Sequence, residues 1–74
     1  MRAHYQDPAQ LRRRRIEAGL TQEGLALKVG LSKSHISGIE RGTAGASAPV
    51  LARLAEAFGC RIGDLMPPVS ASAE

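Results

Sequence analysis

Few side chains in this sequence of 74 residues have a type and spacing that suit catalysis or metal binding. Ser34 and His35 are adjacent, but neighbours on a helix point about 100° apart, and no third group is placed to orient the imidazole. Lys33-Ser34 lacks the preceding glycines of a phosphate-binding loop. A metal site would have to gather His4, His35 and Cys60 from distant segments without any ligand spacing. We therefore expect no enzyme activity, no metal and no cofactor.

The basic side chains point instead to an anionic partner for the first half of the chain. The sequence has ten Lys and Arg and seven Asp and Glu, and residues 1–41 hold eight of the bases and four of the acids. Eight of the ten cations are arginines, whose planar forks match phosphates and base edges, although a GC-rich genome gives the same bias. The run Arg12–Arg15 fans over about 300° of a helix, so it cannot hold one ligand. A solvent-exposed helix face with one ion pair explains that run as well as an anion-binding role does.

The composition describes one small domain with a thin core. Hydrophobic residues make up 43% of the chain, but twelve of them are alanine, and there is one Phe, one Tyr and no Trp. A chain of this size buries roughly 60% of its unfolded surface, which favours a binding module over an enzyme with a deep pocket. No apolar run approaches the ~18–20 residues of a membrane span, and no signal-peptide core is present. Together with the single Cys60, which suits a reducing compartment, this predicts a cytoplasmic protein without a membrane partner.

Capping residues and glycines divide the chain into four short helices. Each helix is expected to begin after an N-cap and to end at a glycine. The N-caps are Asp7, Thr21, Ser32 and Ser47, and the glycines are Gly19, Gly30, Gly42 and Gly59. The fourth helix should bury Val50, Leu51, Leu54, Ala55 and Phe58, and residues 62–66 can form one further helical turn. No stretch alternates with period two, so the sequence predicts an all-α fold over residues 8–66, with a flexible arm at 1–7 and a disordered tail at 67–74.

The joint between the second and third helices is the most informative feature. Val29 to Ser32 allows a turn of about three residues, which sets two helices at roughly 90–120° in the helix-turn-helix geometry. Gly30 supplies the positive φ that a larger residue resists, and Ala26 is small where the third helix crosses. Apolar positions lock the two helices together, namely Leu25, Val29, Leu31, Ile36 and Ile39. The helix over residues 33–41 should therefore project outward, where it can enter a major groove of DNA.

The segment from Gln22 to Gly42 resembles the helix-turn-helix of the Cro and lambda-repressor (XRE) family. The turn glycine, the small alanine, both caps and the Ile-Glu-Arg-Gly ending all have the spacing of that family. The resemblance continues through residues 51–55 and 58–59 and covers roughly residues 9–66. It implies a lambda-repressor-like DNA-binding domain of four helices and a fifth helical turn, which acts on double-stranded DNA as a homodimer.

The resemblance also implies a role for individual residues. The residues expected to face base edges are Lys33, Ser34, Ser37 and Gly38. The residues expected at phosphates are Gln22, Arg41 and Thr43, to which we add Ser32 and Arg14. Arg15 and Glu40 match an ion pair between the first and third helices.

Two features depart from the family pattern. Gly38 stands where relatives carry a side chain that reads DNA, so either base readout is weak there or the backbone approaches DNA closely. The loop Thr43–Ala46 has no Lys or Arg and offers fewer phosphate contacts than in many relatives.

The sequence thus predicts a sequence-specific DNA-binding regulator of transcription, most simply a repressor. The alternative is an antitoxin or adaptor-type interaction module of the same fold, which binds a partner protein as well as DNA. A restriction–modification controller or a phage regulator has a similar size, and the sequence does not separate these. Met66 or Val69 is the candidate self-association surface.

Overall fold

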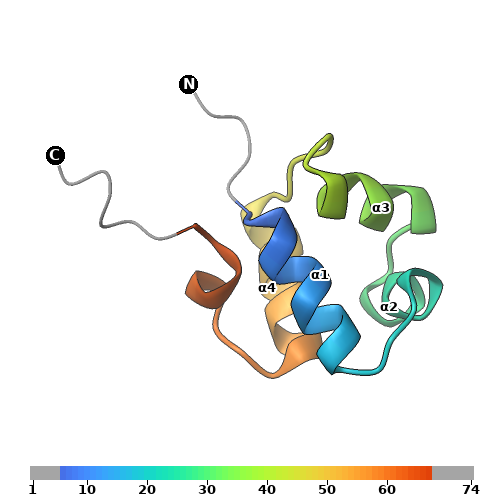
Figure 1. Ribbon diagram of the computed structural model, residues 1–74, viewed down its shortest axis with the longest axis horizontal. Coiled ribbons are helices and arrows are strands. Elements are labelled where there is room, and N and C mark those ends of the chain that lie inside the picture. The colour runs from blue at the N-terminus through green and yellow to red at the C-terminus, as the bar shows by residue number, and fades with distance from the viewer. Residues whose placement is uncertain (1–5, 68–74) are drawn as a thin grey trace, which may run out of the picture.

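The computed structural model describes residues 6–67, and within them the chain is all-helical (Figure 1). The elements in chain order are α1 (Pro8–Glu17), α2 (Gln22–Val29), α3 (Lys33–Arg41), α4 (Ala48–Phe58) and a 3-10 turn, η1 (Ile62–Leu65). The predicted fold of four helices and a fifth turn is confirmed. The expectations for residues 1–5 of the arm, and for residues 68–74 of the tail, lie outside the described residues.

The predicted caps form because short polar side chains satisfy backbone N–H groups that have no partner inside the helix. Asp7, Thr21, Ser32 and Ser47 each accept such a hydrogen bond from two or three residues later, at 2.9 to 3.4 Å. The predicted C-terminal glycines all have φ between 73° and 80°. Each helix therefore starts and stops within one residue of its predicted position.

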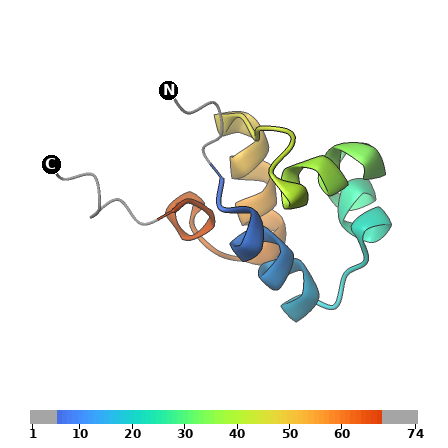
Figure 2. The ribbon, with the colours of Figure 1, turned by 45° about the horizontal axis from the view of Figure 1, so that its top comes forward.

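The core is one cluster to which every helix contributes. Its buried members are Leu11, Leu25, Ala26, Val29, Ile36, Ile39, Ala46, Leu51, Leu54, Ala55 and Leu65. In Figures 1 and 2, α2 and α3 lie on one side of the molecule and η1 lies on the other, with α1 and α4 in the middle. Leu51, Leu54 and Ala55 of the predicted face are buried, but Val50 and Phe58 are only partly buried at the edge of the core.

The N-terminal boundary of the domain differs from the prediction. Gln6 and Asp7 were assigned to a flexible arm, but the Gln6 side chain is only 2% exposed and the Asp7 N–H donates to the Leu65 carbonyl at 2.8 Å. Gln6 and Asp7 are thus packed against the rest of the domain. The sequence pattern could not show this, because the groups that Gln6 contacts lie 33 to 40 residues away.

Candidate nucleic-acid interface

The turn between α2 and α3 has the geometry that its sequence predicts. Gly30 ends α2 with φ 75° and ψ 32°, a left-handed conformation that other residues resist. The Leu31 N–H then donates back to the Ala26 carbonyl at 2.9 Å. Ala26 is 3% exposed beneath the joint. The chain turns sharply from α2 into α3 as a result, and α3 lies at the outside of the molecule (Figure 2).

The two faces of α3 differ sharply in character. Ile36 and Ile39 are both 1% exposed in the core. Lys33 and Ser34 are exposed on the outer side, and Ser37 is half-buried beside them. This division follows from the spacing of apolar residues at i and i+3. The polar side of α3 is therefore available to a ligand.

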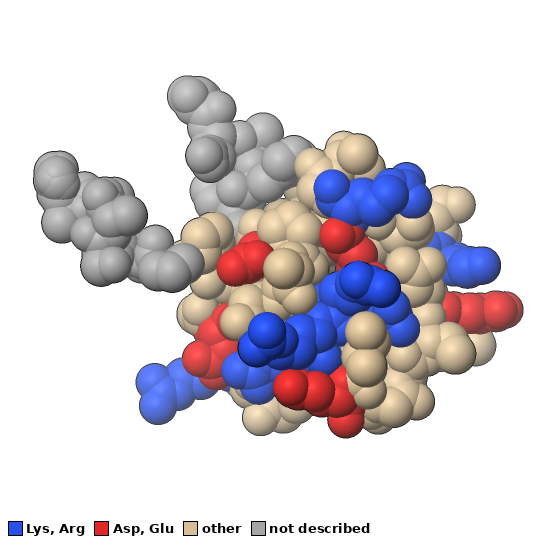
Figure 3. Space-filling view, viewed as in Figure 1, with Lys and Arg blue, Asp and Glu red and all other residues tan. Residues whose placement is uncertain are grey.

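Five residues that the sequence assigned to DNA surround one open hollow of about 310 Å³. They are Gln22, Lys33, Ser34, Ser37 and Arg41. Gln22 comes from the first turn of α2 and the other four come from α3, so the joint brings the two helices together at this surface. Figure 3 shows Lys and Arg side chains over α1 and α3 on one face of the molecule.

A nearly buried carboxylate joins three elements behind this hollow. The Nε atom of Arg15 donates to Glu40 at 2.7 Å, and its Nη1 donates to the Leu20 carbonyl at 2.8 Å. The two side chains are 13% and 4% exposed. The predicted partners Arg15 and Glu40 are thus in contact, and their ion pair ties α1 to α3. Burial makes the intact pair nearly neutral for stability but makes the loss of one partner costly.

Glu40 also orients Gln22, a contact that sequence reasoning missed. The Gln22 Nε2 donates to Glu40 Oε1 at 3.2 Å, while Arg15 Nη2 donates to the same oxygen at 3.3 Å. An amide nitrogen carries two hydrogens, so the second hydrogen is left for a ligand. Glu40 therefore fixes the direction of an amide on the edge of the hollow.

Arg41 and Ser37 form a pair along the outer side of α3. They are four residues apart, which places them on the same side of a helix, and Arg41 Nη1 donates to the Ser37 hydroxyl. The hydroxyl hydrogen of Ser37 remains available as a donor. The pair gives the C-terminal half of α3 one cation and one hydroxyl at the hollow.

Ser32 and Thr43 lie at the two ends of α3, and both are exposed. The Ser32 hydroxyl accepts from the His35 N–H at 3.0 Å, so it caps the helix. The Thr43 hydroxyl donates to the Gly38 carbonyl at 3.3 Å. The first N–H groups of a helix have no internal partners and favour anions, which suits the N-terminus of α3.

Gly38 does not face outward as predicted. It is buried, and a Cβ built there would lie 3.1 Å from the Cβ of Ala44. Its carbonyl accepts from the N–H groups of Thr43 and Ala44, at 2.9 and 3.1 Å. The absence of a side chain lets the loop after α3 pack against the helix. Gly38 is therefore a packing position for that loop and cannot contact base edges from this site.

Arg14 was expected at a phosphate, and the contact that it makes within the domain is with η1. Its Nη2 lies 4.0 Å from Asp64 of η1. Successive residues of a helix differ by about 100° in direction, so Arg14 cannot share the direction of Arg15, which points to Glu40. Arg14 thus faces η1 and is not among the residues that line the hollow beside α3.

The residues considered for chemistry do not converge. Among residues 6–67, no three His, Cys, Asp or Glu side chains are placed to share a metal ion, and His4 lies outside that range. Cys60 is partly buried. Burial raises the pKa of its thiol, an effect that Arg14 opposes and Asp64 reinforces. The thiol is therefore protonated at neutral pH and is a poor nucleophile.

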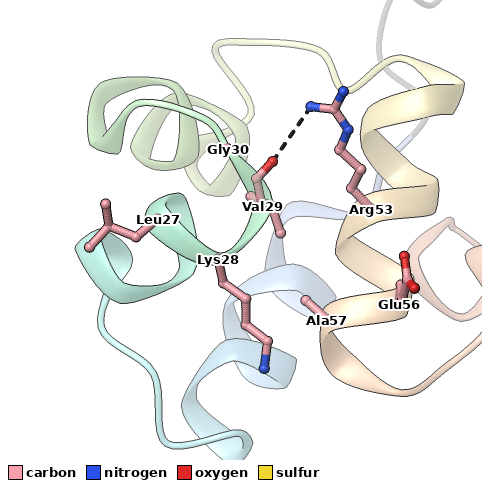
Figure 4. A pocket seen from close by; sticks show the side chains of 7 residues that line it. All are labelled: Leu27, Lys28, Val29, Gly30, Arg53, Glu56 and Ala57. Carbon is pink, nitrogen blue, oxygen red and sulfur yellow. Dashed lines mark hydrogen bonds between the residues drawn. The ribbon is translucent and has the colours of Figure 1, made fainter.

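A larger hollow of about 710 Å³ lies between the end of α2 and α4 (Figure 4). Arg53 crosses it and donates to the Val29 carbonyl at 3.5 Å. Leu27 at its edge is 80% exposed. None of the residues that the sequence assigned to DNA lines this hollow, so it is separate from the surface of α3.

A comparison with protein families identifies the family to which this arrangement of helices belongs. A family model described as helix-turn-helix matches residues 11–65, which include most of α1 and everything from α2 to η1. The chain belongs to this helix-turn-helix family. The resemblance to the Cro and lambda-repressor type is confirmed with it. No curated protein gave a significant match.

Solved structures of helix-turn-helix regulators align along most of their length. The restriction-modification controller protein C.AhdI from Aeromonas hydrophila is 36% identical, with a TM-score of 0.76, over 80% of this chain and 89% of that one. The clp gene regulator ClgR from Corynebacterium glutamicum is 30% identical, with a TM-score of 0.74, over 90% of this chain and 87% of that one. This chain thus aligns with structures of regulators over most of its length.

An enzyme shares the helix-turn-helix architecture over part of its length. Hydroxypropylphosphonic acid epoxidase from S. wedmorenis is 28% identical, with a TM-score of 0.78, over 84% of this chain. The aligned part is 33% of the epoxidase chain. This likeness is evidence for the fold alone and does not indicate an activity.

In the part of the chain that the structure describes, no helix is both long and apolar enough to cross a membrane.

Proposed function

We propose that this protein binds double-stranded DNA in a sequence-specific manner, with α3 in the major groove, and thereby regulates transcription. One observation carries the proposal. Gln22, Lys33, Ser34, Ser37 and Arg41 surround a single open surface on the outside of a helix-turn-helix. The major groove is wide enough to admit one α-helix, and polar side chains on that helix can read the edges of base pairs.

The residues divide into two roles under this proposal. Lys33, Ser34 and Ser37 face base edges, because they lie on the outer side of α3. Phosphate contacts come from Arg41 and Gln22, together with Ser32 and Thr43 at the ends of α3. Phosphate contacts fix the register of the protein on DNA, and base contacts supply specificity. Under this proposal, binding involves no chemical step and no cofactor. The protein acts in the cytoplasm, where its DNA partner lies.

We further propose that two copies bind as a two-fold dimer. One α3 of nine residues reads a short half-site, and paired readers bind half-sites about one helical turn apart. The surface we favour for self-association is the apolar hollow lined by Ala48, Leu51, Ile62 and Met66. Ile62 is 38% exposed there, and Met66 is one of the two residues that the sequence singled out. The other, Val69, lies outside the described residues.

Selection of binding sites from random duplexes tests the proposal. The expected result is enrichment of one motif with two symmetric half-sites about one helical turn apart. Enrichment of a single half-site would overturn the dimer but leave the binding mode intact. Failure to enrich any motif, with the folded protein present, would overturn sequence-specific binding.

A narrower candidate is a controller of restriction–modification genes. It is favoured by the 36% identity to C.AhdI, which extends over 80% of this chain. Locating the selected motif on the source chromosome tests it. Sites upstream of a gene pair for an endonuclease and a methyltransferase would support it, and sites elsewhere would contradict it. A partner protein that co-purifies in fixed stoichiometry would favour the antitoxin or adaptor alternative instead.

A further inference from the structure

Gln6 is a polar residue that is only 2% exposed, and the proposed function does not use it. Its side chain is an amide with one oxygen acceptor and one nitrogen that carries two donors. Burying such a group without partners is costly, so its contacts decide what it does. All of them lead to the segment between α3 and α4.

The amide contacts three backbone groups in this segment. Gln6 Nε2 donates to the Ala44 carbonyl at 2.7 Å and to the Ile39 carbonyl at 3.3 Å. Gln6 Oε1 accepts from the Ala46 N–H at 3.1 Å. One side chain from the N-terminal end of the domain thus joins the last turn of α3 to both ends of the loop 44–46.

The same loop is also held by the Gly38 carbonyl, which accepts from the N–H groups of Thr43 and Ala44. Thr43 directly precedes Ala44, the residue that both Gly38 and Gln6 contact, and it is exposed. Its position relative to α3 is therefore fixed by contacts that Gly38 and Gln6 make with the backbone. The proposed function places a DNA phosphate at Thr43 and at the adjacent end of α3.

We propose that Gln6 is a positioning residue for DNA binding, which holds the loop after α3 so that the Thr43 hydroxyl can turn its hydrogen from the Gly38 carbonyl, 3.3 Å away, to a phosphate oxygen. This rests on the proposed function, in which α3 lies in the major groove. Gln6 itself lies beneath the loop and does not touch the DNA. Because phosphate contacts are made on any sequence, loss of Gln6 should weaken binding to all duplexes alike.

The test uses Gln6→Met in the full chain. Methionine keeps the length of the side chain but cannot donate to the two carbonyls or accept from the Ala46 N–H. We expect hydrogen exchange of the Ala46 amide in the DNA-free protein to become at least tenfold faster. At a temperature where the variant is fully folded, affinity for the selected site and for a random duplex should both fall by about tenfold.

A double-mutant cycle with Thr43→Val shows whether the effect passes through Thr43. If it does, Gln6→Met combined with Thr43→Val binds DNA no more weakly than Gln6→Met alone. Ala52→Gly is the matched control. Ala52 is exposed in the middle of α4, so glycine there lowers stability through helix propensity without removing a contact. This control should leave DNA affinity unchanged.

Gln6→Glu provides a second variant of the same size, which keeps the acceptor for the Ala46 N–H but loses both donors. It should show the same loss of affinity. The proposal is overturned if folded Gln6 variants bind DNA as Ala52→Gly does, or if the effects of Gln6→Met and Thr43→Val are additive. If the parent chain binds no duplex, the proposed function fails, whereas the exchange of Ala46 still reports whether Gln6 holds the loop.

Discussion

At the scale of single residues, Glu40 has the largest structural role at the interface. Its carboxylate is 4% exposed and accepts from both Arg15 and Gln22. Removing it leaves the Arg15 cation nearly buried without its counter-charge, and it also leaves the Gln22 amide without an orienting partner. Stability and DNA binding therefore depend on the same side chain.

Glu40→Ala should lower the free energy of unfolding by about 3 kcal/mol, the range expected when one member of a buried pair is removed. Urea unfolding followed by circular dichroism measures this. Glu17→Ala is the control, because Glu17 is exposed at the end of α1 and should change stability by less than about 0.5 kcal/mol. Equal effects of the two substitutions would contradict the structural role of the ion pair.

Lys33→Ala tests base readout. Lys33 is exposed at the start of α3, so its removal should leave the fold intact. We expect affinity for the selected site to fall by about 10-fold or more, the range for loss of a good base contact, and affinity for random DNA to fall less. Titration of both duplexes measures the ratio. Equal losses on both would make Lys33 a phosphate contact.

Gly38→Val tests the packing of the loop against α3. Its Cβ would lie 3.1 Å from Ala44 Cβ and 3.4 Å from Thr43 Oγ1, so the added methyl groups force the loop outward. We expect a loss of about 2 kcal/mol in thermal or urea unfolding. The matched control is Gly63→Ala, where nothing lies within 4 Å of the new Cβ. Similar stability of both variants would contradict the close packing.

At the scale of the helices, the boundaries could be predicted because their signals are local. Each cap acts within three residues, and each terminal glycine acts on its own φ angle. The side of α3 that is buried could be predicted from the spacing of Ile36 and Ile39. Local patterns of this kind therefore account for the elements and for four of the outward residues on α3.

Several contacts between elements could not be predicted. The structure places Arg14 at 4.0 Å from Asp64 and packs Gly38 against Ala44. Gln6 was expected in an arm but is buried. Each outcome depends on the direction of a side chain toward an element that is distant in sequence or on a loop whose path no pattern fixes. Caps, glycines and apolar spacing act locally, so they reveal neither the direction of such a side chain nor the path of such a loop.

Gly30→Ala tests the joint as an element. No atom lies within 4 Å of a Cβ at Gly30, so the cost comes from the φ of 75° alone. We expect a loss of about 1 kcal/mol in unfolding free energy. Gly30→Asn should lose less, because asparagine adopts this conformation more readily. A neutral Gly30→Ala would show that the turn relaxes to another conformation.

At the scale of the whole molecule, electrostatics set the strength of binding. Arg41 is the cation at the hollow beside α3 that we assign to a phosphate, so a dimer would neutralise about two phosphates there. Counterion release then predicts that affinity falls by about tenfold between about 50 and 200 mM salt. Fluorescence anisotropy over a salt series measures the slope. A flat response would contradict the phosphate contact by Arg41.

The shared carboxylate of Glu40 has a consequence for how this protein can change over generations. A descendant that loses the guanidinium at position 15 inherits an unbalanced anion at position 40, and one that loses the acid inherits an unbalanced cation. Either single step lowers the stability of the fold, whereas a paired exchange for apolar residues keeps the fold but leaves the Gln22 amide without its orienting partner. We therefore expect residues 15 and 40 to change together, with residue 22 limiting which replacements are tolerated.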